Sequence, residues 1–385
     1  MPDHYSAQEM LAKLVSFPTV SRDTNLPLMD FVEEYLAGHG VQSHRVYSAC
    51  ETKCNLYALV GPEEAGGVVL SGHTDVVPVD GQAWETDPFT LVEKGSRLYG
   101  RGSCDMKGFD ALALCAVPKA LAAGVKRPLQ LALSYDEETG MDGAYRLVPE
   151  MAAHMPPAQA VIVGEPSEMQ VVTGHKGGLM LHTHVHGYEV HSSLVHTGVS
   201  ATMIAARLIT WLEDVMAENR AKSDPNSLFV PPYTTLHVGM VNGGTARNIV
   251  AKDCTFSTDV RCIPGDLSTD YAARYKAKVA EVEAEMQKIH PDTRIEVEIR
   301  GDIPGCRPAM AVEAEALCRA LTGDNAEHVV SYGTEAGLFQ DGGYSACICG
   351  PGNIEQAHQP NEFIEKSQLA AGEAFMDRLV ERLAA

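Results

Sequence analysis

GGVVLSGHTDVV, residues 66–77, is the stretch that decides the fold. Its β-branched run leads directly into His73 and Asp75, which is typical of a buried strand that ends in polar side chains. Residues 108–124 (GFDALALCAVPKALAAG) are predicted to form a helix that ends at Gly124, and two more strand-like runs follow at 128–138 and 158–166. Strands that alternate with helices predict an α/β domain with a mainly parallel sheet.

The middle of the chain has another pattern. Residues 179–187 (LMLHTHVHG) alternate strictly, as in a strand with one face toward water. We expect that face to carry His182, His184 and His186, and we favour this interpretation over a metal site. Helical stretches at about 201–220 and 268–287, with strand-like runs between and after them, complete the order β-α-β-β-α-β. This order predicts an inserted α+β domain of the ferredoxin-like type.

The tail, from residue 327 on, returns to the α/β pattern. We therefore assign residues 1–176 and 301–385 to one domain and residues 177–300 to the domain inserted into it. A chain of 385 residues is long enough for two cores.

The amino-acid composition argues against several classes of protein. Hydrophobic residues make up 45% and charged residues 21%, the balance of a soluble globular chain. The formal net charge of −21 argues against nucleic acid as a partner, because binding it needs a basic face. No apolar run approaches the ~20 residues of a membrane helix, and the N-terminus does not resemble a signal peptide. We expect a cytoplasmic protein without a membrane partner, whose ten cysteines are reduced and mostly buried.

Side chains that can bind metal follow several predicted strands. His73 and Asp75 follow one strand, Glu137 and Glu138 the next, and Glu165 a third, while Asp105 lies in the glycine-rich turn GRGSCDMKG. In an open α/β sheet the ends of such strands gather at one crevice. Each residue alone is more often a cap, a turn residue or a surface group. The set as a whole indicates a metal site, because imidazole and carboxylate groups suit zinc.

Chemistry suggests roles for these groups. His73 is a ligand, and Asp75 can hydrogen-bond its imidazole and so fix the tautomer. Asp105 is a natural bridge between two ions. One of the adjacent Glu137 and Glu138 can bind metal while the other acts as general base.

The segments SGHTDVVP, GRGSCDMKG, YDEETG, VGEPS and GPGNIEQAHQPNEFI closely resemble the acetylornithine deacetylase family. That family belongs to the superfamily of di-zinc aminoacylases, desuccinylases and carboxypeptidases. The resemblance implies a zinc-aminopeptidase-like catalytic domain, Glu137 as the general base and Asp75 as the orienting carboxylate. It also implies two zinc ions, which cobalt can replace. The first would be bound by His73, Asp105 and Glu165, and the second by Asp105, Glu138 and His358. Without the resemblance, His358 would be an ordinary loop histidine.

The inserted domain shares the resemblance, which implies that it is a dimerisation (lid) domain. GYEVHSSLVHTGVSA, residues 187–201, is similar to the family segment whose histidine, here His191, reaches the partner subunit's active site. The segment departs from the family at Val195, where proline is usual. Asn248 and Arg261 correspond to residues that bind the substrate's α-carboxylate, although Arg261 could instead form a structural ion pair.

The resemblance predicts a homodimer that hydrolyses the amide bond of an Nα-acyl amino acid, foremost N-acetyl-L-ornithine in arginine biosynthesis. Glu335, in a TEA segment, is a candidate partner for the substrate's ammonium group, or else it holds its own loop. A desuccinylase, aminoacylase or dipeptidase with the same metal centre is the first alternative, and a non-catalytic binding protein is the second. The sequence lacks the phosphate-binding and serine-nucleophile motifs GxxxxGK[ST] and GxSxG.

Overall fold

The computed structural model describes residues 4–385. Backbone contacts divide the chain into two compact units. The first unit comprises Met1–Gly174, Cys306–His328 and Thr334–Ala385, and the second comprises His175–Gly305 and Val329–Gly333. Residues 175–176, 301–305 and 329–333, which the sequence suggested for the first domain, thus cluster with the second unit.

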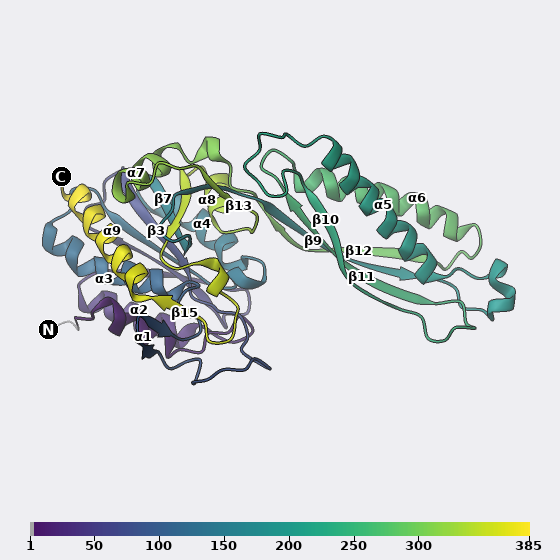
Figure 1. The fold of residues 1–385 in the computed structure, drawn as a ribbon, viewed down its shortest axis with the longest axis horizontal. Helices are drawn as coiled ribbons and strands as arrows, with labels where there is room; N and C mark the ends of the chain where they lie inside the picture. Colours follow the sequence, from purple (N-terminus) through teal and green to yellow (C-terminus); the bar gives the residue numbers. More distant parts are fainter. Residues whose placement is uncertain (1–3) are drawn as a thin grey trace. The chain divides into compact units, whose positions relative to one another are not determined.

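Seven neighbouring strands of an eight-stranded sheet, all except β13, form the centre of the first unit (Figure 1). Its strand order is β1-β2-β6-β3-β7-β14-β8-β13. The inner strands β6, β3, β7 and β14 are parallel, as predicted, and β1, β2 and β8 pair antiparallel. The bounds are β1 Ser43–Tyr47, β2 Cys54–Val60, β3 Gly67–His73, β6 Leu129–Ser134, β7 Ala158–Pro166, β8 Val172–His175, β13 His328–Val330 and β14 Ala346–Gly350.

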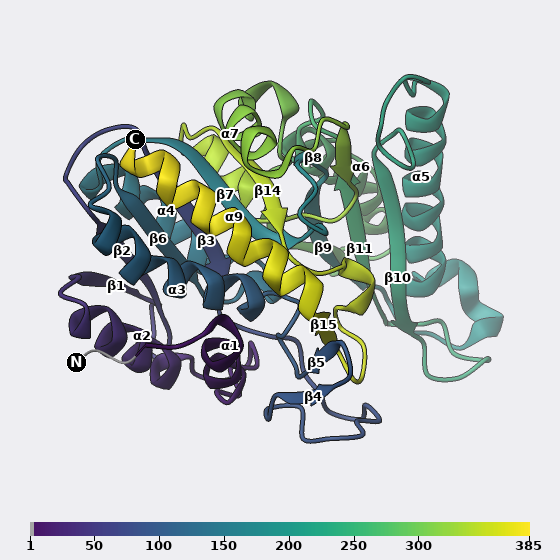
Figure 2. The same cartoon turned by 60° about the vertical axis from the view of Figure 1, so that its left-hand side comes forward.

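Helices cover both faces of this sheet. On β3, Gly72 has no room for a Cβ because it faces Asp110 of α3. The neighbouring residue Ser71 donates a hydrogen bond to Glu335 at the start of α8. Successive strand residues point to opposite faces, so α3 and α8 lie on opposite sides. The helix α9 runs beside α3 (Figure 2). The helices of this unit are α1 Ala7–Val15, α2 Leu26–Gly38, α3 Lys107–Ala123, α4 Asp142–His154, α7 Val312–Thr322, α8 Ala336–Asp341 and α9 Lys366–Ala384.

Local sequence explains where these elements end. A capping box joins Ser6 and Glu9 at the start of α1. The helix α3 ends at Gly124, as predicted, with a left-handed φ of 61° that favours glycine. A small sheet, in the order β15-β5-β4, consists of β15 Phe363–Glu365, β5 Arg97–Tyr99 and β4 Val92–Lys94. It joins the segment before α3 to the segment before α9.

The second unit has the predicted β-α-β-β-α-β order. Its antiparallel sheet, β10-β11-β9-β12, has its own apolar core with α5 and α6. Thr183 and Val185 of β9 are buried, while His182, His184 and His186 lie on the other face, as predicted. The bounds are β9 Gly177–His186, α5 Ala201–Ala221, β10 Thr235–Gly243, β11 Asp253–Cys262, α6 Ser268–Gln287 and β12 Arg294–Ile303.

The prediction that the cysteines are mostly buried is confirmed. All ten cysteines are free, and Cys50 alone among them is exposed. None of the helices in residues 4–385 has the length and apolar composition that crossing a membrane requires.

Candidate metal centre

His73 is the last residue of β3, and its imidazole is buried. Its Nδ1 lies 2.9 Å from the carbonyl oxygen of Asp75. A carbonyl oxygen can only accept, so Nδ1 must carry the proton and donate it. The other nitrogen, Nε2, lies 3.0 Å from Asp105 Oδ1 and 3.8 Å from Glu165 Oε1. Nε2 is therefore the atom of His73 that is available to a metal ion.

Asp105 stands between two histidines. Its Oδ1 is the oxygen near His73 Nε2, and its Oδ2 lies 3.4 Å from His358 Nε2. A carboxylate that offers one oxygen to each side is placed to bridge two ions about 3.5–4 Å apart.

Glu138 and His358 complete the second side. Glu138 Oε2 lies 3.0 Å from His358 Nε2, although 220 residues separate the two in sequence. His358 belongs to the loop between the 3₁₀ turn η4 (Ile354–Gln356) and β15, and its side chain is half exposed. The structure thus brings the five predicted metal ligands together with Glu137. In each of two groups of three residues, the donor atoms lie within 4.8 Å of one another. One group is His73, Asp105 and Glu138, and the other is His73, Glu137 and Glu165.

Asp75 holds other residues of the site in position. It accepts the backbone N–H groups of Glu137 and Glu138 at 3.1 and 3.4 Å, and the Ser21 hydroxyl at 2.7 Å. Its Oδ1 is also 3.6 Å from His73 Nδ1. One buried carboxylate therefore orients both the first histidine and the turn η1, Glu137–Thr139, that carries the adjacent glutamates.

The crowded carboxylates of this cluster favour the binding of cations. Burial, and then neighbouring carboxylates, raise the pKa of Glu137, Glu138 and Glu165. Hydrogen bonds to Asp105 and Glu138 raise the pKa of His358 to about 10. Both shifts mean that the protein alone would balance its crowded carboxylates with protons. Metal ions can take the place of those protons, and an imidazole and carboxylate donor set suits zinc.

Glu335 lies on the opposite face of β3 from α3, with its side chain buried. Its two oxygens accept hydrogen bonds from Ser71, at 3.2 Å, and from Ser134. Burial raises its pKa. These bonds tie the start of α8 to β3 and β6, and direct contact of Glu335 with a substrate ammonium stays a prediction.

The three other predicted site residues belong to the second unit. His191 is exposed, and its Nδ1 accepts the backbone N–H of Ser193 at 3.2 Å. The carbonyl of Asn248 accepts the N–H of Ser192 at 2.9 Å, so Asn248 and His191 lie in adjoining segments. Arg261, on β11, forms an ion pair with Asp259 at 2.9 Å and is partly exposed.

Sequence analysis missed Glu362. This buried carboxylate accepts the backbone N–H groups of Gly102, Cys104 and Asp105 at 2.9–3.1 Å and pairs with buried Arg101 at 2.7 Å. It therefore shapes the turn that presents Asp105. An acid four residues beyond His358 was the only signal in the sequence, and spacing alone could not connect it with residue 105.

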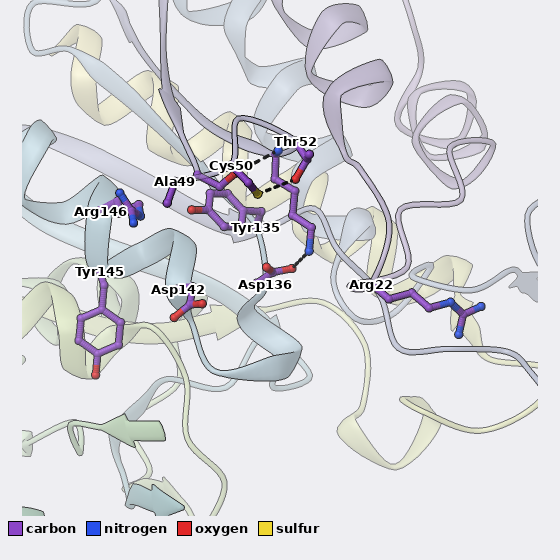
Figure 3. Close-up of a pocket in the computed structure, with 11 residues that line it drawn as sticks. Arg22, Ala49, Cys50, Thr52, Tyr135, Asp136, Asp142, Tyr145 and Arg146 are labelled. Carbon is purple, nitrogen blue, oxygen red and sulfur yellow. Dashed lines mark hydrogen bonds and ion pairs between the residues drawn. The ribbon is translucent and has the colours of Figure 1, made fainter. Parts of the chain in front are cut away.

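Lys53 was missed as well. Its Nζ lies 2.5 Å from Asp136 Oδ1 and also donates to the Ser21 carbonyl. Asp136, which precedes Glu137, has a left-handed φ of 58°. Lys53 and Asp136 line a cavity of about 570 Å³ together with Cys50 and Arg146. Figure 3 shows how Asp136, Cys50 and Arg146 lie around this cavity. Lys53 thus anchors Asp136, the residue that precedes the glutamate turn.

Comparisons with known proteins agree with this geometry. The model of Peptidase family M20/M25/M40 matches residues 69–382. An acetylornithine deacetylase of Myxococcus xanthus is 35% identical over 376 residues, covering 96% of this chain and 95% of its own.

Two solved structures share the fold. An M20 family metallo-carboxypeptidase from Sulfolobus solfataricus superposes with a TM-score of 0.75 at 18% identity, over 99% of each chain. A dinuclear metal binding peptidase of the M20 family from Bacillus subtilis gives a TM-score of 0.63 at 15% identity, over 98% of this chain and 97% of its own. With the family model matched over most of its length and the donor cluster in place, the chain belongs to Peptidase family M20/M25/M40 and is a metal-binding hydrolase of amide bonds.

Proposed function

We propose that the protein removes the acetyl group from N-acetyl-L-ornithine, giving L-ornithine and acetate in arginine biosynthesis. The observation that carries the chemistry is Asp105, whose two oxygens face His73 and His358 separately, with Glu137 beside them. The name of the Myxococcus relative supports the substrate.

The residues fit two zinc ions. His73, Asp105 and Glu165 would bind one, and Asp105, Glu138 and His358 the other. When bound, the ions would supply Lewis acidity to the attacking water and to the acyl carbonyl. Replacement by cobalt and a cytoplasmic location are further predictions.

Glu137 acts as the general base. It accepts a proton from the water whose oxygen bonds to the acyl carbon, and it then delivers that proton to the amide nitrogen as the C–N bond breaks. Burial raises the pKa of Glu137, which makes its protonated form a competent acid in the second step. Asp75 holds Glu137 through the backbone during both proton transfers.

Residues of the second unit would complete the site in a homodimer. His191 of one subunit would stabilise the oxyanion in the other subunit's site, because an imidazole can donate to a developing negative charge. Asn248 and Arg261 would bind the α-carboxylate, since a guanidinium offers paired donors to it. Glu335 would bind the ornithine ammonium through the carboxylate lone pairs that the hydrogen bonds from Ser71 and Ser134 leave free.

One experiment tests the proposal. Chelated protein, restored with zinc or cobalt, is offered Nα-acetyl-L-ornithine, N-succinyl-diaminopimelate, uncharged N-acetyl amino acids and dipeptides, and the free amine is measured. We expect acetylornithine to give the highest kcat/KM and chelated protein to be inactive. A tenfold preference for another substrate would transfer the assignment to a desuccinylase, aminoacylase or dipeptidase. Full activity after chelation would remove the metal mechanism.

A further inference from the structure

A second group of metal-capable side chains lies on the outer face of the antiparallel sheet in the second unit. His184 and His186 of β9 point away from the helices, because the residues that alternate with them, Thr183 and Val185, are buried in the core. Strand register places Glu296 of β12 opposite His184 and Asp253 of β11 opposite His186. Three strands therefore contribute to one cluster.

The donor atoms are close together. Atoms of His184, His186 and Glu296 lie within 4.8 Å of one another. Asp253 Oδ1 is 3.0 Å from His184 Nε2 and 3.4 Å from His186 Nδ1, and Glu296 Oε2 is 3.4 Å from His186 Nε2. The centroids of the two imidazole rings are 3.6 Å apart.

His184 Nε2 and Asp253 Oδ1 form one direct hydrogen bond, but no hydrogen bond within the described residues accounts for the position of His186 Nε2. His186 Nε2 is shielded from solvent and finds no hydrogen-bond partner in residues 4–385. A separation of 3.4 Å is long for an N–H···O bond. It is close to the distance between two ligand atoms on tetrahedral zinc, which is about 3.3 Å for metal–ligand bonds of about 2.0–2.1 Å. Two imidazoles this close would repel each other if both were protonated, whereas one metal ion can bind both.

The remaining contacts fit the same assignment. Arg294 occupies the other oxygen of Glu296, with Nε 2.8 Å from Oε1, and leaves Oε2 for the histidine side. Asp253 faces Nδ1 of His186 while Glu296 faces Nε2. This is the arrangement in which a carboxylate holds one nitrogen of a ring and the other nitrogen binds metal.

We propose that His184, His186 and Glu296 bind a divalent transition-metal ion of the zinc class, with Asp253 orienting His186. The site shares no residue with the proposed catalytic centre and does not depend on the proposed function. The ion would fasten β9 to β12 directly and to β11 through Asp253.

The test uses the full chain, stripped of metal and dialysed against buffered Zn²⁺ alone. We expect three ions per chain, and one ion in the double variant His73→Ala/His358→Ala, which disables the proposed catalytic centre. Adding His186→Ala or Glu296→Gln to the double variant should remove that ion, and Asp253→Asn should weaken its binding by about 10–100-fold. Circular dichroism checks that each variant is folded.

His182→Ala is the matched control. His182 is on the same face of β9, but it lies next to Ser257, 3.3 Å from its hydroxyl, and belongs to no donor set. This variant should keep the ion. The proposal is overturned if the double variant binds no ion, if His186→Ala leaves binding unchanged, or if His182→Ala weakens it equally. None of these outcomes bears on the deacetylase assay, and a failed assay leaves this site untouched.

Discussion

The carboxylate of Asp75 accepts the backbone N–H of Glu137 at 3.1 Å while it faces the imidazole of His73, its Oδ1 3.6 Å from Nδ1. The proposed base and a proposed metal ligand are thus oriented by one side chain. We expect Asp75→Asn to weaken metal binding by about 10–100-fold, because it removes the charge behind His73. It should also lower kcat when metal is saturating, because the turn that carries Glu137 loosens. Metal titration and kinetics separate the two effects, and a variant with normal kcat at saturating metal would limit Asp75 to ligand orientation.

Substitution of Glu137 and substitution of Glu138 should impair different properties of the enzyme. Glu137→Gln removes proton transfer at constant size, so kcat should fall by about 10²–10⁴-fold with metal content nearly unchanged. Glu138→Gln should lower the occupancy of one metal site, because Glu138 contacts His358. Metal analysis beside kcat checks both variants, which serve as each other's control. Near-normal kcat in Glu137→Gln would show that the two roles are assigned wrongly.

The proposed site shared between two subunits predicts complementation between inactive variants. Glu137→Ala and His191→Ala chains are mixed under conditions that exchange subunits. In a mixed dimer one site carries both defects and the other carries neither. Random exchange should make about half of the dimers mixed, so roughly a quarter of all sites should be active. If His191 served its own chain, every site would retain a defect. No recovery despite demonstrated exchange would exclude His191 from the partner's site.

The buried carboxyl group of Asp110 should make the stability of the folded protein depend on pH. Burial raises its pKa to about 8, and neither carboxylate oxygen has a hydrogen-bond partner within residues 4–385. An unfolded chain loses this proton near pH 3.9, so between about pH 4 and 8 the folded chain binds more protons. Stability therefore falls as pH rises through that window. For metal-free protein, the Tm of Asp110→Asn minus that of the parent should increase from pH 5 to pH 8. A constant difference would contradict the raised pKa.

The sequence predicted those features that depend on neighbours along the chain. Strand ends pointed to His73 and Glu165, and a glycine-rich turn pointed to Asp105. Strict alternation separated the buried Val185 from the exposed face of His184. Contacts between distant segments could not be obtained in this way. Glu362 stabilises the Asp105 turn from 257 residues away, and Glu296 lies over 100 residues from the histidines it faces.

His358 is another residue that the local sequence pattern could not identify. Its distance from Glu138 along the chain leaves no local pattern, and only resemblance to a family pointed to it. Lys53 and Asp110 were invisible for a different reason. An ionisable side chain that the fold covers looks in sequence like one on the surface, and how far it is covered depends on the complete packing.

The position of Glu362 has a consequence for how the protein is made. The turn of Asp105 is synthesised early, but the carboxylate that accepts its backbone N–H groups follows only after the whole second unit has been translated. His358 is equally late. A nascent chain that has not yet extended past residue 362 can therefore form neither the complete turn nor the complete set of ligands. Metal capture should then be a late, post-translational event, and ribosome-bound intermediates should retain metal poorly however well their first strands have folded.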